Sequence, residues 1–446
     1  FIDTLIDKED KYNALRDFLD KKHPKIKGVK TGDKIISSED FKTEIPKIIS
    51  NLDNSYIYIQ GPPGSGKTYQ ASNAIIQLLK QNKKIGITGL SHKVIHNLLQ
   101  RVEDMAKEKQ FNFDGYKRGN LEDEDTVFNG EFIKTYEKDP VFMDALKEKD
   151  VGQIFAGTKY HLASTFYDQK IDYLFIDEAG QISLADLISI GNIAKNIILI
   201  GDQNQLGQPI KGTHPNNSGQ SILDYLLEGK DTIPEDRGIF LNKTYRLNSI
   251  LNEFISSNFY EERLICDERT DKRIIKFNKK SLIKDDGIHY VEMKHKNNVQ
   301  TSIEEFEVVR DLMKEMIGNE FDDNGSKRKL TVEDFLVISP YNTQVNLLIS
   351  KLEEAKIKNP RVGTIDKFQG QEAPVTIISM TSSDSDSLPR NKEFFFSRNR
   401  LNVAISRAQV ASIILFNPNL LDSSPKNLDQ IKLMNNFFKF LNFKKN

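Results

Sequence analysis

Short apolar runs alternate with longer amphipathic segments along most of the chain. The runs are bounded by turn residues, a pattern typical of strands that are buried on both faces of a parallel sheet. Strands are predicted at residues 56–59, 84–88, 173–176, 196–200, 335–339, 375–380 and 411–416. Segments with apolar residues three and four apart, such as 303–317, predict helices between them. The alternation predicts an α/β fold in which helices cover parallel sheets.

Two segments interrupt this alternation. Residues 101–150 are rich in charge and contain no strand pattern, so we expect a helical insertion there. Residues 319–328 combine Asn, Asp, Gly and basic side chains, which predicts an exposed loop. Proline, glycine and charges cluster at residues 231–238 and predict a divide between two domains. The expected organisation is an N-terminal segment at 1–50, a first domain at 51–235 and a second domain at 236–446.

Composition narrows the possible functions. A chain of 446 residues is too long for one core and suits two domains. Its formal net charge of −1 gives no overall attraction to a polyanion, so any nucleic acid would need a locally basic groove. Cys266 is the only cysteine, which excludes a disulfide framework and four-cysteine metal sites. No apolar run reaches membrane-spanning length and no signal peptide is evident, so we expect a cytoplasmic protein without a membrane partner.

A phosphate-binding loop directly follows the predicted strand at 56–59. It consists of Gly61, Pro62, Pro63, Gly64, Ser65, Gly66, Lys67 and Thr68. Such a loop directs backbone N–H groups at phosphate oxygens, and the helix that follows presents its positive end to the same anion. Lys67 is expected to reach the β- and γ-phosphates, and the Thr68 hydroxyl is expected to bind Mg²⁺. The sequence therefore predicts a nucleotide-binding protein.

Acidic and amide side chains end two further predicted strands. Asp177 and Glu178 follow the strand at 173–176. The first suits a ligand in the Mg²⁺ coordination shell, and the second suits the base that polarises an attacking water. Gln205 follows the strand at 196–200 and could sense the γ-phosphate. Taken alone, the two acids would be interpreted as a solvated strand end, and Gln205 could simply lie in a turn. Because the acids follow Lys67 in the same α/β pattern, the catalytic interpretation is favoured.

The ordered motifs resemble those of superfamily 1 helicases. They occupy residues 61–68, 177–180, 201–206, 243–246, 362–372 and 399–408. The branch that they resemble contains the nonsense-mediated-decay helicases and the nuclease-helicases of DNA end processing. Residues 177–183, 207–215 and 395–402 look most like the helicase half of bacterial proteins that carry an N-terminal RecB-like nuclease. The resemblance covers about residues 51 to 420.

This resemblance implies two RecA-like domains with ATP and Mg²⁺ in the cleft between them. Lys67, Thr68, Asp177, Glu178 and Gln205 match the positions that the first domain supplies. Arg246 and Arg407 match the family's arginine-finger positions in the second domain. Tyr245 resembles the residue that stacks on adenine, and Glu372 the residue that contacts the ribose. Residues 1–59 contain no glutamine at the place where these helicases usually read the adenine edge, so selectivity for ATP is less firmly expected.

The activity implied is ATP-driven movement along single-stranded nucleic acid, with DNA favoured over RNA and movement from 5′ to 3′. RNA unwinding, remodelling of protein–nucleic acid complexes without unwinding, and a nucleotide-gated binding module are the alternatives. The chain begins with Phe, and a nuclease domain or partner of the kind found in the nearest relatives would precede residue 1.

Contacts to the nucleic-acid backbone are expected from polar residues at strand ends, where family motifs meet the strand. These are Ser91, His92, Thr158, Pro340, Tyr341 and Thr364. Small hydroxyls and backbone amides suit phosphate contact without base reading, although each could be an ordinary cap or turn residue. His92 and His96 could share a zinc ion, but a packing or strand-contact role is favoured because no third ligand is evident. Glu292 and Lys294 imitate part of a nuclease motif, and a strand is the favoured interpretation.

Overall fold

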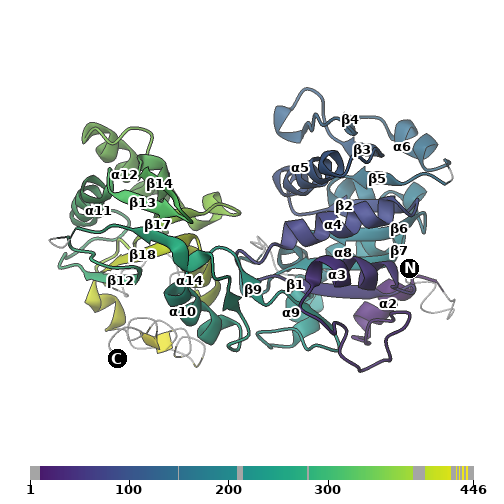
Figure 1. Ribbon diagram of the computed structural model, residues 1–446, viewed down its shortest axis with the longest axis horizontal. Coiled ribbons are helices and arrows are strands. Elements are labelled where there is room, and N and C mark those ends of the chain that lie inside the picture. The colour runs from purple at the N-terminus through teal and green to yellow at the C-terminus, as the bar shows by residue number, and fades with distance from the viewer. Residues whose placement is uncertain are drawn as a thin grey trace. The chain divides into compact units, whose positions relative to one another are not determined.

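The computed structural model divides into two compact units (Figure 1). Unit 1 comprises residues 1–62, 66–203 and 207–241, and unit 2 comprises residues 63–65, 204–206 and 242–446. The structure describes residues 11–148, 150–207, 214–278, 281–384 and 397–422, together with residues 428, 431, 434, 435, 438 and 439. Most of the motif at 207–215, and the start of the one at 395–402, lie outside the described residues.

Unit 1 is built on a parallel sheet whose central strands are apolar on both faces. In spatial order its eight described strands are β4 (Ile133–Tyr136), β3 (Asp114–Arg118), β5 (Gln153–Ala156), β2 (Lys84–Thr88), β6 (Ile171–Ile176), β7 (Ala194–Gly201), β1 (Tyr56–Gln60) and β8 (Gly238–Phe240). Every pairing in it is parallel, so all the carboxyl ends of the strands lie at one edge. All five residues of β1 are buried, as expected for a strand covered on both faces.

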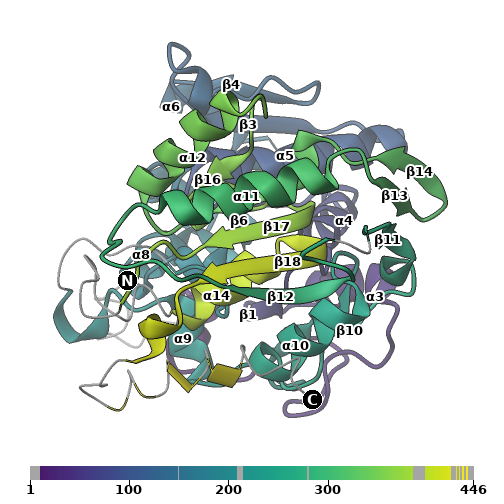
Figure 2. The ribbon, with the colours of Figure 1, turned by 90° about the vertical axis from the view of Figure 1, so that its left-hand side faces the viewer.

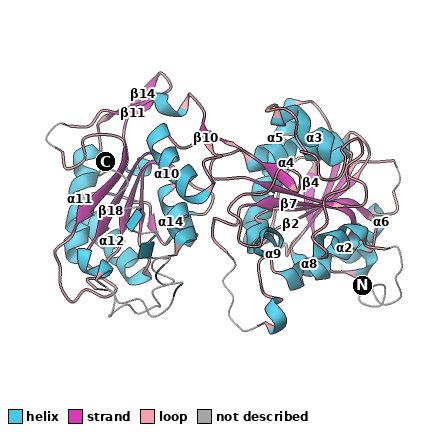
Figure 3. Cartoon of the chain, turned by 90° about the horizontal axis from the view of Figure 1, so that it is seen from below, coloured by secondary structure: helices cyan, strands magenta, loops and turns pink. Residues whose placement is uncertain are grey.

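Helices cover both faces of this sheet (Figure 3). One face carries α3 (Phe41–Ser50), α4 (Lys67–Leu79) and α5 (His92–Glu108). Their apolar residues form one core with alternate residues of the strands, for example Ile75 with Ile57 and Ile87. The other face carries α2 (Asn13–Leu19), α8 (Leu184–Ile190) and α9 (Ile222–Leu227). Two short helices, α6 (Asp139–Ala145) and α7 (Lys159–Leu162), lie in the connections around β5.

The prediction of a helical insertion without strands at residues 101–150 was wrong. This region contributes β3 and β4, which extend the sheet in parallel beyond β5. In β3 buried residues alternate with half-buried or exposed ones and most residues are polar, whereas only the first residue of β4 is buried. β4 is the edge strand and β3 is the next one in, and neither has the apolar run that identifies a strand buried on both faces.

Unit 2 contains a second parallel sheet (Figure 2). Its described strands, in spatial order, are β12 (Gly287–Glu292), β18 (Ala408–Phe416), β17 (Ala373–Ser379), β15 (Phe335–Ile338) and β16 (Val362–Gly363). One face packs against α11 (Ile303–Met316) and α12 (Asn342–Glu354), whose buried residues share a core with β15, β17 and β18. The other face carries α10 (Ser249–Phe259) and α14 (Arg398–Ile405). The predicted fold class, with two RecA-like α/β units and parallel sheets, is confirmed.

A small antiparallel sheet replaces the predicted loop at 319–328. It consists of β11 (Arg273–Ile275), β13 (Glu320–Asp323) and β14 (Ser326–Lys329). Asn324 and Gly325 form the turn of the β13–β14 hairpin, and both have positive φ angles, of 55° and 90°. Asn-Gly is the dipeptide that favours such a two-residue turn, so the prediction of a loop missed a readable signal. In the part of the chain that the structure describes, no helix is long and apolar enough to cross a membrane.

Candidate nucleotide and nucleic-acid site

Three neighbouring strands of unit 1 lead into predicted nucleotide residues. The phosphate loop follows β1, Asp177 follows β6, and the turn that leads to Gln205 follows β7, which pairs with both of the other strands. In a parallel sheet these carboxyl ends lie side by side, which is where α/β proteins place their ligands. The fold therefore brings together residues that are more than a hundred positions apart in the sequence.

Glycine conformations and the position of Lys67 define the phosphate loop. Gly64 and Gly66 have φ angles of 72° and 80°, in the left-handed region that favours glycine. Gly66 is the N-cap of α4, so the amino end of that helix faces the loop. Lys67 Nζ donates a hydrogen bond of 2.6 Å to the Gly61 carbonyl, which keeps the ammonium group over the loop. This is the geometry of an anion-binding loop backed by a helix dipole.

Asp177 and Glu178 form a tight acidic pair at the end of β6. Asp177 is buried, and its Oδ1 accepts a 2.9 Å hydrogen bond from the Glu178 backbone N–H. Burial and the neighbouring Glu178 carboxylate raise the pKa of Asp177 to about 7, against the opposing effects of that hydrogen bond and of Lys67. Glu178 itself has a φ angle of 51°, which is strained for a residue other than glycine.

The donor set at this edge fits a magnesium ion held partly by phosphates. A buried carboxylate that is disfavoured as an anion gains most from a nearby cation, and Asp177 is such a group. Among the described residues, no group of three or more His, Cys, Asp and Glu side chains could hold a metal by itself. Mg²⁺ commonly takes only one or two protein oxygens and completes its shell with phosphates and water. Asp177 and the Thr68 hydroxyl would supply those two oxygens.

The tip of the phosphate loop packs within unit 2, against the segment that contains Tyr245 and Arg246. Thr244 Oγ1 donates to the Pro63 carbonyl at 2.8 Å, and the Tyr245 N–H donates to the Gly64 carbonyl at 2.9 Å. A Cβ atom on Gly64 would lie only 2.5 Å from Arg246 Cβ and 2.7 Å from Thr244 Oγ1. Gly64 is therefore required both by its backbone conformation and by this close approach. The contact places Arg246 directly beside the phosphate loop.

Arg246 and Glu372 form an ion pair in unit 2. The Arg246 Nε and Glu372 Oε2 atoms are 2.5 Å apart, and Arg246 Nη1 donates to the Ser406 carbonyl at 3.0 Å. The other Glu372 oxygen accepts from Gln409 Nε2 at 2.8 Å. Burial alone would raise the pKa of Glu372, but the Arg246 charge and these hydrogen bonds lower it. Glu372 thus holds Arg246, in addition to the ribose contact expected of it.

Arg407, the second predicted finger, lies next to the Arg246 pair. It follows Ser406, whose carbonyl binds Arg246, and its Nη1 donates to the Gln371 carbonyl at 3.3 Å. Its side chain is almost completely buried. Unit 2 therefore brings Arg246, Arg407 and Glu372 together, although they come from three separate motifs.

Tyr245 presents an aromatic ring that is partly exposed. Its side chain is 45% exposed, and the Arg269 guanidinium lies over the ring at 5.5 Å from the centroid. Arg273 donates to the Tyr245 and Arg246 carbonyls at 3.1 and 3.0 Å and also pairs with Asp323. An exposed ring on a fixed backbone suits the expected stacking on a base.

Gln205 lies in a turn that unit 2 fixes by amide side chains. Asn399 Nδ2 donates to the Gln205 carbonyl at 2.7 Å, and Asn402 Nδ2 donates to the Asn204 carbonyl at 2.8 Å. Both donors belong to α14, and Arg407 follows two residues after the end of that helix. The turn and the arginine motif are therefore mechanically linked through α14.

The predicted nucleic-acid contacts of unit 1 lie at the same edge of the sheet, on the neighbouring strands β2 and β5. Ser91 is the N-cap of α5 and accepts from the Val94 N–H at 3.4 Å, and Thr158 is the N-cap of α7. His92 is half-buried, and its Nδ1 lies 2.8 Å from Lys117 Nζ in β3. β2 pairs with both β5 and β6. The predicted nucleic-acid contacts therefore follow strands that adjoin the one carrying Asp177.

The corresponding residues of unit 2 follow the paired strands β15 and β16. Pro340 and Tyr341 lie between β15 and α12, and Thr364 caps a 3₁₀ turn after β16. Tyr341 is buried, whereas Pro340 and Thr364 are partly exposed. In both units the proposed strand contacts thus occupy the carboxyl ends of adjacent parallel strands.

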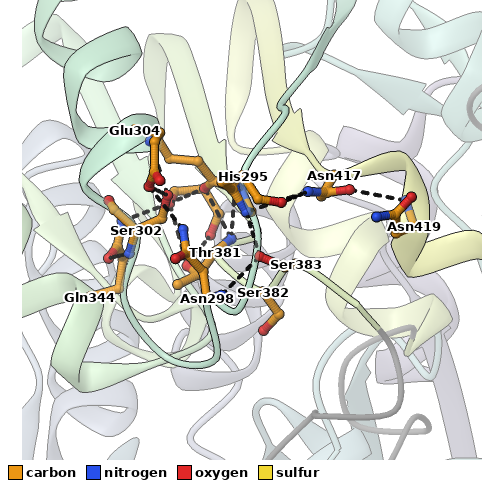
Figure 4. A network of polar contacts seen from close by, with 12 residues as sticks. His295, Asn298, Ser302, Glu304, Gln344, Thr381, Ser382, Ser383, Asn417 and Asn419 are labelled. Carbon is orange, nitrogen blue, oxygen red and sulfur yellow. Dashed lines mark hydrogen bonds and ion pairs between the residues drawn. The ribbon is translucent and has the colours of Figure 1, made fainter.

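A buried polar network supports this edge of unit 2 (Figure 4). Thr381, just beyond β17, has a φ angle of 72°, which is rare for a β-branched residue. Its N–H donates to both Glu305 oxygens, at 3.0 and 2.9 Å. Glu305 also accepts from Ser379 Oγ at 2.5 Å, and His295 Nε2 lies 3.2 Å from it. Thr381 Oγ1 in turn lies 3.2 Å from Ser339 Oγ, directly before Pro340.

Several residues of these sites could not be recognised from the sequence. Thr244 lies inside the motif at 243–246, but nothing in that motif shows that its hydroxyl holds Pro63. Arg269, Arg273 and Gln409 lie outside the motifs used, and only the fold brings them to Tyr245, Arg246 and Glu372. The role of Glu305 has no sequence signal, because a carboxylate on an amphipathic helix usually faces solvent.

Comparison with known proteins identifies two matching domain families and several related helicases. An AAA domain family matches residues 46–210, and a second AAA domain family matches residues 219–419. The chain is 28% identical over 406 residues to the DNA replication ATP-dependent helicase/nuclease dna2 of Schizosaccharomyces pombe, covering 83% of this chain and 27% of that protein. Together, these similarities and the order of the motifs support a superfamily 1 helicase.

Other relatives are named as DNA helicases or as RNA helicases. DNA polymerase alpha-associated DNA helicase A of Schizosaccharomyces pombe is 26% identical over 410 residues, which cover 78% of this chain and 59% of that protein. RNA helicase Mov10l1 of Mus musculus is 25% identical over 442 residues, which cover 87% of this chain and 35% of that protein. The chain therefore spans less than two thirds of the length of the curated relatives it matches.

Proposed function

We propose that this chain is an ATP-driven translocase that moves along single-stranded nucleic acid. The observation that carries the proposal is the close packing of Arg246 against Gly64 of the phosphate loop, within unit 2. A guanidinium held at a phosphate loop stabilises the charge that develops on the γ-phosphate, and it ties hydrolysis to the element that carries it. This coupling between hydrolysis and the position of the arginine is what would convert nucleotide turnover into movement.

In this proposal the residues that follow the strands of unit 1 bind the nucleotide and begin hydrolysis. The loop from Gly61 to Thr68 binds the phosphates, Lys67 neutralises their charge, and Glu178 accepts a proton from the attacking water. Bound Mg²⁺ would neutralise charge on the phosphates, with Asp177 and Thr68 as its protein ligands. Gln205 senses the γ-phosphate and communicates with α14 through Asn399.

The residues of unit 2 complete the proposed nucleotide chemistry. Arg246 and Arg407 act on the γ-phosphate in the transition state, Tyr245 stacks on the base, and Glu372 contacts the ribose and orients Arg246. Glu372 can have both roles because its two carboxylate oxygens bind different partners, Arg246 and Gln409.

The nucleic-acid strand is proposed to follow the carboxyl ends of the strands. Ser91, His92 and Thr158 would contact it in unit 1, and Pro340, Tyr341 and Thr364 in unit 2. These positions offer hydroxyls and backbone N–H groups rather than base-reading side chains, which suits sequence-independent binding of the backbone. DNA is favoured over RNA, movement from 5′ to 3′ is proposed, and membership of the nuclease-helicase branch follows the name of the fission-yeast relative.

ATPase turnover in the presence of different nucleic acids tests the proposal. Single-stranded DNA should stimulate turnover strongly and more than RNA or duplex, because strand binding favours the hydrolytic state. Lys67→Ala should abolish turnover with every nucleic acid. Turnover that single strands leave unchanged would contradict the coupling.

Unwinding of forked duplexes in the presence of a trap strand separates the alternatives. Strand separation that requires a 5′ single-stranded arm supports a 5′-to-3′ helicase. Stimulated ATPase without separation on any fork would instead indicate a remodelling ATPase.

A further inference from the structure

A groove lined by lysines lies on the helical face of unit 1, away from the residues assigned above. Its volume is about 520 Å³, and it runs along α3 and α4 to the end of α5. Lys42 and Lys47 of α3, Lys109 at the end of α5, and Asn73, Gln77 and Gln81 on or just after α4 line it. The α4 residues are four apart and run from mid-helix toward its carboxyl end, so the groove leads away from the phosphate loop.

Asn73 joins the three helices at the floor of this groove. Its side chain is only 3% exposed, and its Nδ2 donates to the Lys42 carbonyl at 2.7 Å. That carbonyl lacks its usual helical donor because Pro46, four residues later, has no N–H. Asn73 Oδ1 accepts from Lys109 Nζ at 2.9 Å, which holds this ammonium group in the groove. The position of Lys109 is therefore fixed by buried structure.

The positive charge in the groove is not balanced by acidic groups. None of the described residues that line it is Asp or Glu, and Lys42, Lys47 and Lys109 form no ion pair with any described carboxylate. Partial burial, and then the charges of Lys80 and Lys42, lower the pKa of Lys109, with only Glu108 opposing them. Glu108 itself pairs with Arg101. Concentrated like charge in a concave site favours an anionic ligand.

The lining favours a phosphate backbone over an acidic peptide. Pro46 is the only apolar residue among the described residues that line the groove. A peptide groove usually provides apolar pockets for anchoring side chains, which this lining lacks. Lysines interleaved with Asn and Gln side chains are the groups that contact phosphate oxygens in nucleic-acid complexes.

We propose that this groove is a second nucleic-acid site, which binds the sugar–phosphate backbone outside the single-strand path. The inference rests on the proposed function, since it takes the ligand to be the substrate of the motor. The groove would bind a part of the nucleic acid that lies outside the single strand held at the carboxyl ends of the β-strands. The contact is electrostatic and independent of sequence.

Binding measurements on two substrates test this proposal. One substrate is a single strand of about ten nucleotides, enough for the strand path alone. The other is a fork with the same single-stranded arm and a duplex of about twenty base pairs, which releases counterions wherever its phosphates are neutralised. The variant Lys42→Ala/Lys47→Ala/Lys109→Ala removes the lysines, and Lys276→Ala/Lys314→Ala/Lys358→Ala removes equal charge from unit 2 as a control. Gln77→Glu places a carboxylate in the groove and leaves every lysine present.

Fluorescence anisotropy should show that the groove variants bind the fork at least about tenfold more weakly at moderate salt, and the control variant as tightly as wild type. The slope of log K against log salt should fall by about 2 to 3 for the triple groove variant. Binding of the short strand, and the ATPase that it stimulates, should not change. Groove variants that bind the fork like the control would overturn the proposal. Loss of poly-glutamate binding with unchanged fork binding would also overturn it, by indicating an acidic peptide.

These measurements also distinguish the groove from the motor. If wild-type ATPase is not stimulated by the short strand, the proposed function fails, whatever the groove binds. If stimulation is normal and the groove variants bind the fork normally, only the groove proposal fails.

Discussion

Glu178 is the residue whose substitution separates nucleotide binding from hydrolysis. We expect Glu178→Gln to bind ATP with Mg²⁺ but to hydrolyse it at least about a hundredfold more slowly, because the amide cannot accept the proton of the attacking water. Equilibrium binding of a fluorescent ATP analogue and single-turnover hydrolysis measure the two properties. Glu253→Gln, at an exposed position of α10, is the control. Wild-type turnover in Glu178→Gln would remove this residue from the catalytic role.

His161 makes the stability of unit 1 sensitive to mild acid. Burial, and then the Arg118 charge, lower the pKa of His161 to about 4, although Asp139 opposes them, and its Nε2 lies 2.8 Å from the Tyr167 hydroxyl. The folded pKa lies below the unfolded value near 6.5, so this contribution is complete above pH 6.5 and is lost as the pH falls toward 4. At pH 5 the loss attributable to His161 is about 2 kcal/mol.

Urea unfolding of wild type and His161→Asn at several pH values measures this effect. Asn cannot titrate, so the variant should lose less stability than wild type between pH 8 and pH 5, after a constant offset for the lost Tyr167 contact. Parallel pH profiles for the two proteins would show that His161 does not titrate as expected.

The phosphate loop is the element in which steric fit can be tested most simply. Gly64→Ala places a Cβ against Arg246 and Thr244, whereas Gly28→Ala, at a similar φ angle of 87°, meets no atom within 4 Å. Both substitutions cost roughly 1 kcal/mol in backbone strain. We expect Gly64→Ala to lose about 1 to 3 kcal/mol more in urea unfolding because of the overlap. Equal losses would mean that the loop and residues 244–246 do not pack as described.

The turn after β17 depends on α11. Glu305→Ala leaves the Thr381 N–H and the Ser379 hydroxyl without their buried acceptor, and a positive φ angle at Thr381 then has no compensation. We expect a loss of at least about 2 kcal/mol in the free energy of unfolding of unit 2. Glu304→Ala, one residue earlier and more exposed, should cost less than about 1 kcal/mol. A larger loss for Glu304→Ala would contradict the assignment.

How far the sequence predicts these elements depends on burial. The central strands and the helix at 303–317 were predicted because apolar residues repeat at the period of each element. The pattern does not predict β3 and β4, because these two outer strands of the sheet carry mostly polar residues. Nor does it predict the β13–β14 hairpin, although Asn324-Gly325 signals its turn. The strained φ of Thr381 could not be predicted, because it depends on a carboxylate 76 positions away.

At the scale of the whole molecule, the motifs predict which residues carry chemistry but not their partners. β6, β7 and β1 are parallel neighbours in the sheet, so the segments that follow them, with Asp177, Gln205 and the phosphate loop, begin at the same edge. The pairing of Arg246 with Glu372 and Gln409, and the lysine groove around Asn73, follow from long-range packing that no local pattern encodes. Unit 1 carries the acids Asp177 and Glu178, and unit 2 carries Arg246 and Arg407.

Hydrolysis of ATP by Arg407→Ala, measured with and without single-stranded DNA, tests this division of labour most directly. Nucleotide binding should persist, because Lys67 and the backbone N–H groups of the phosphate loop remain unchanged, while stimulated hydrolysis should fall about a thousandfold. Circular dichroism and ATP binding establish that the variant is folded. Stimulated hydrolysis at the wild-type rate in folded Arg407→Ala would contradict the proposal that Arg407 acts on the γ-phosphate.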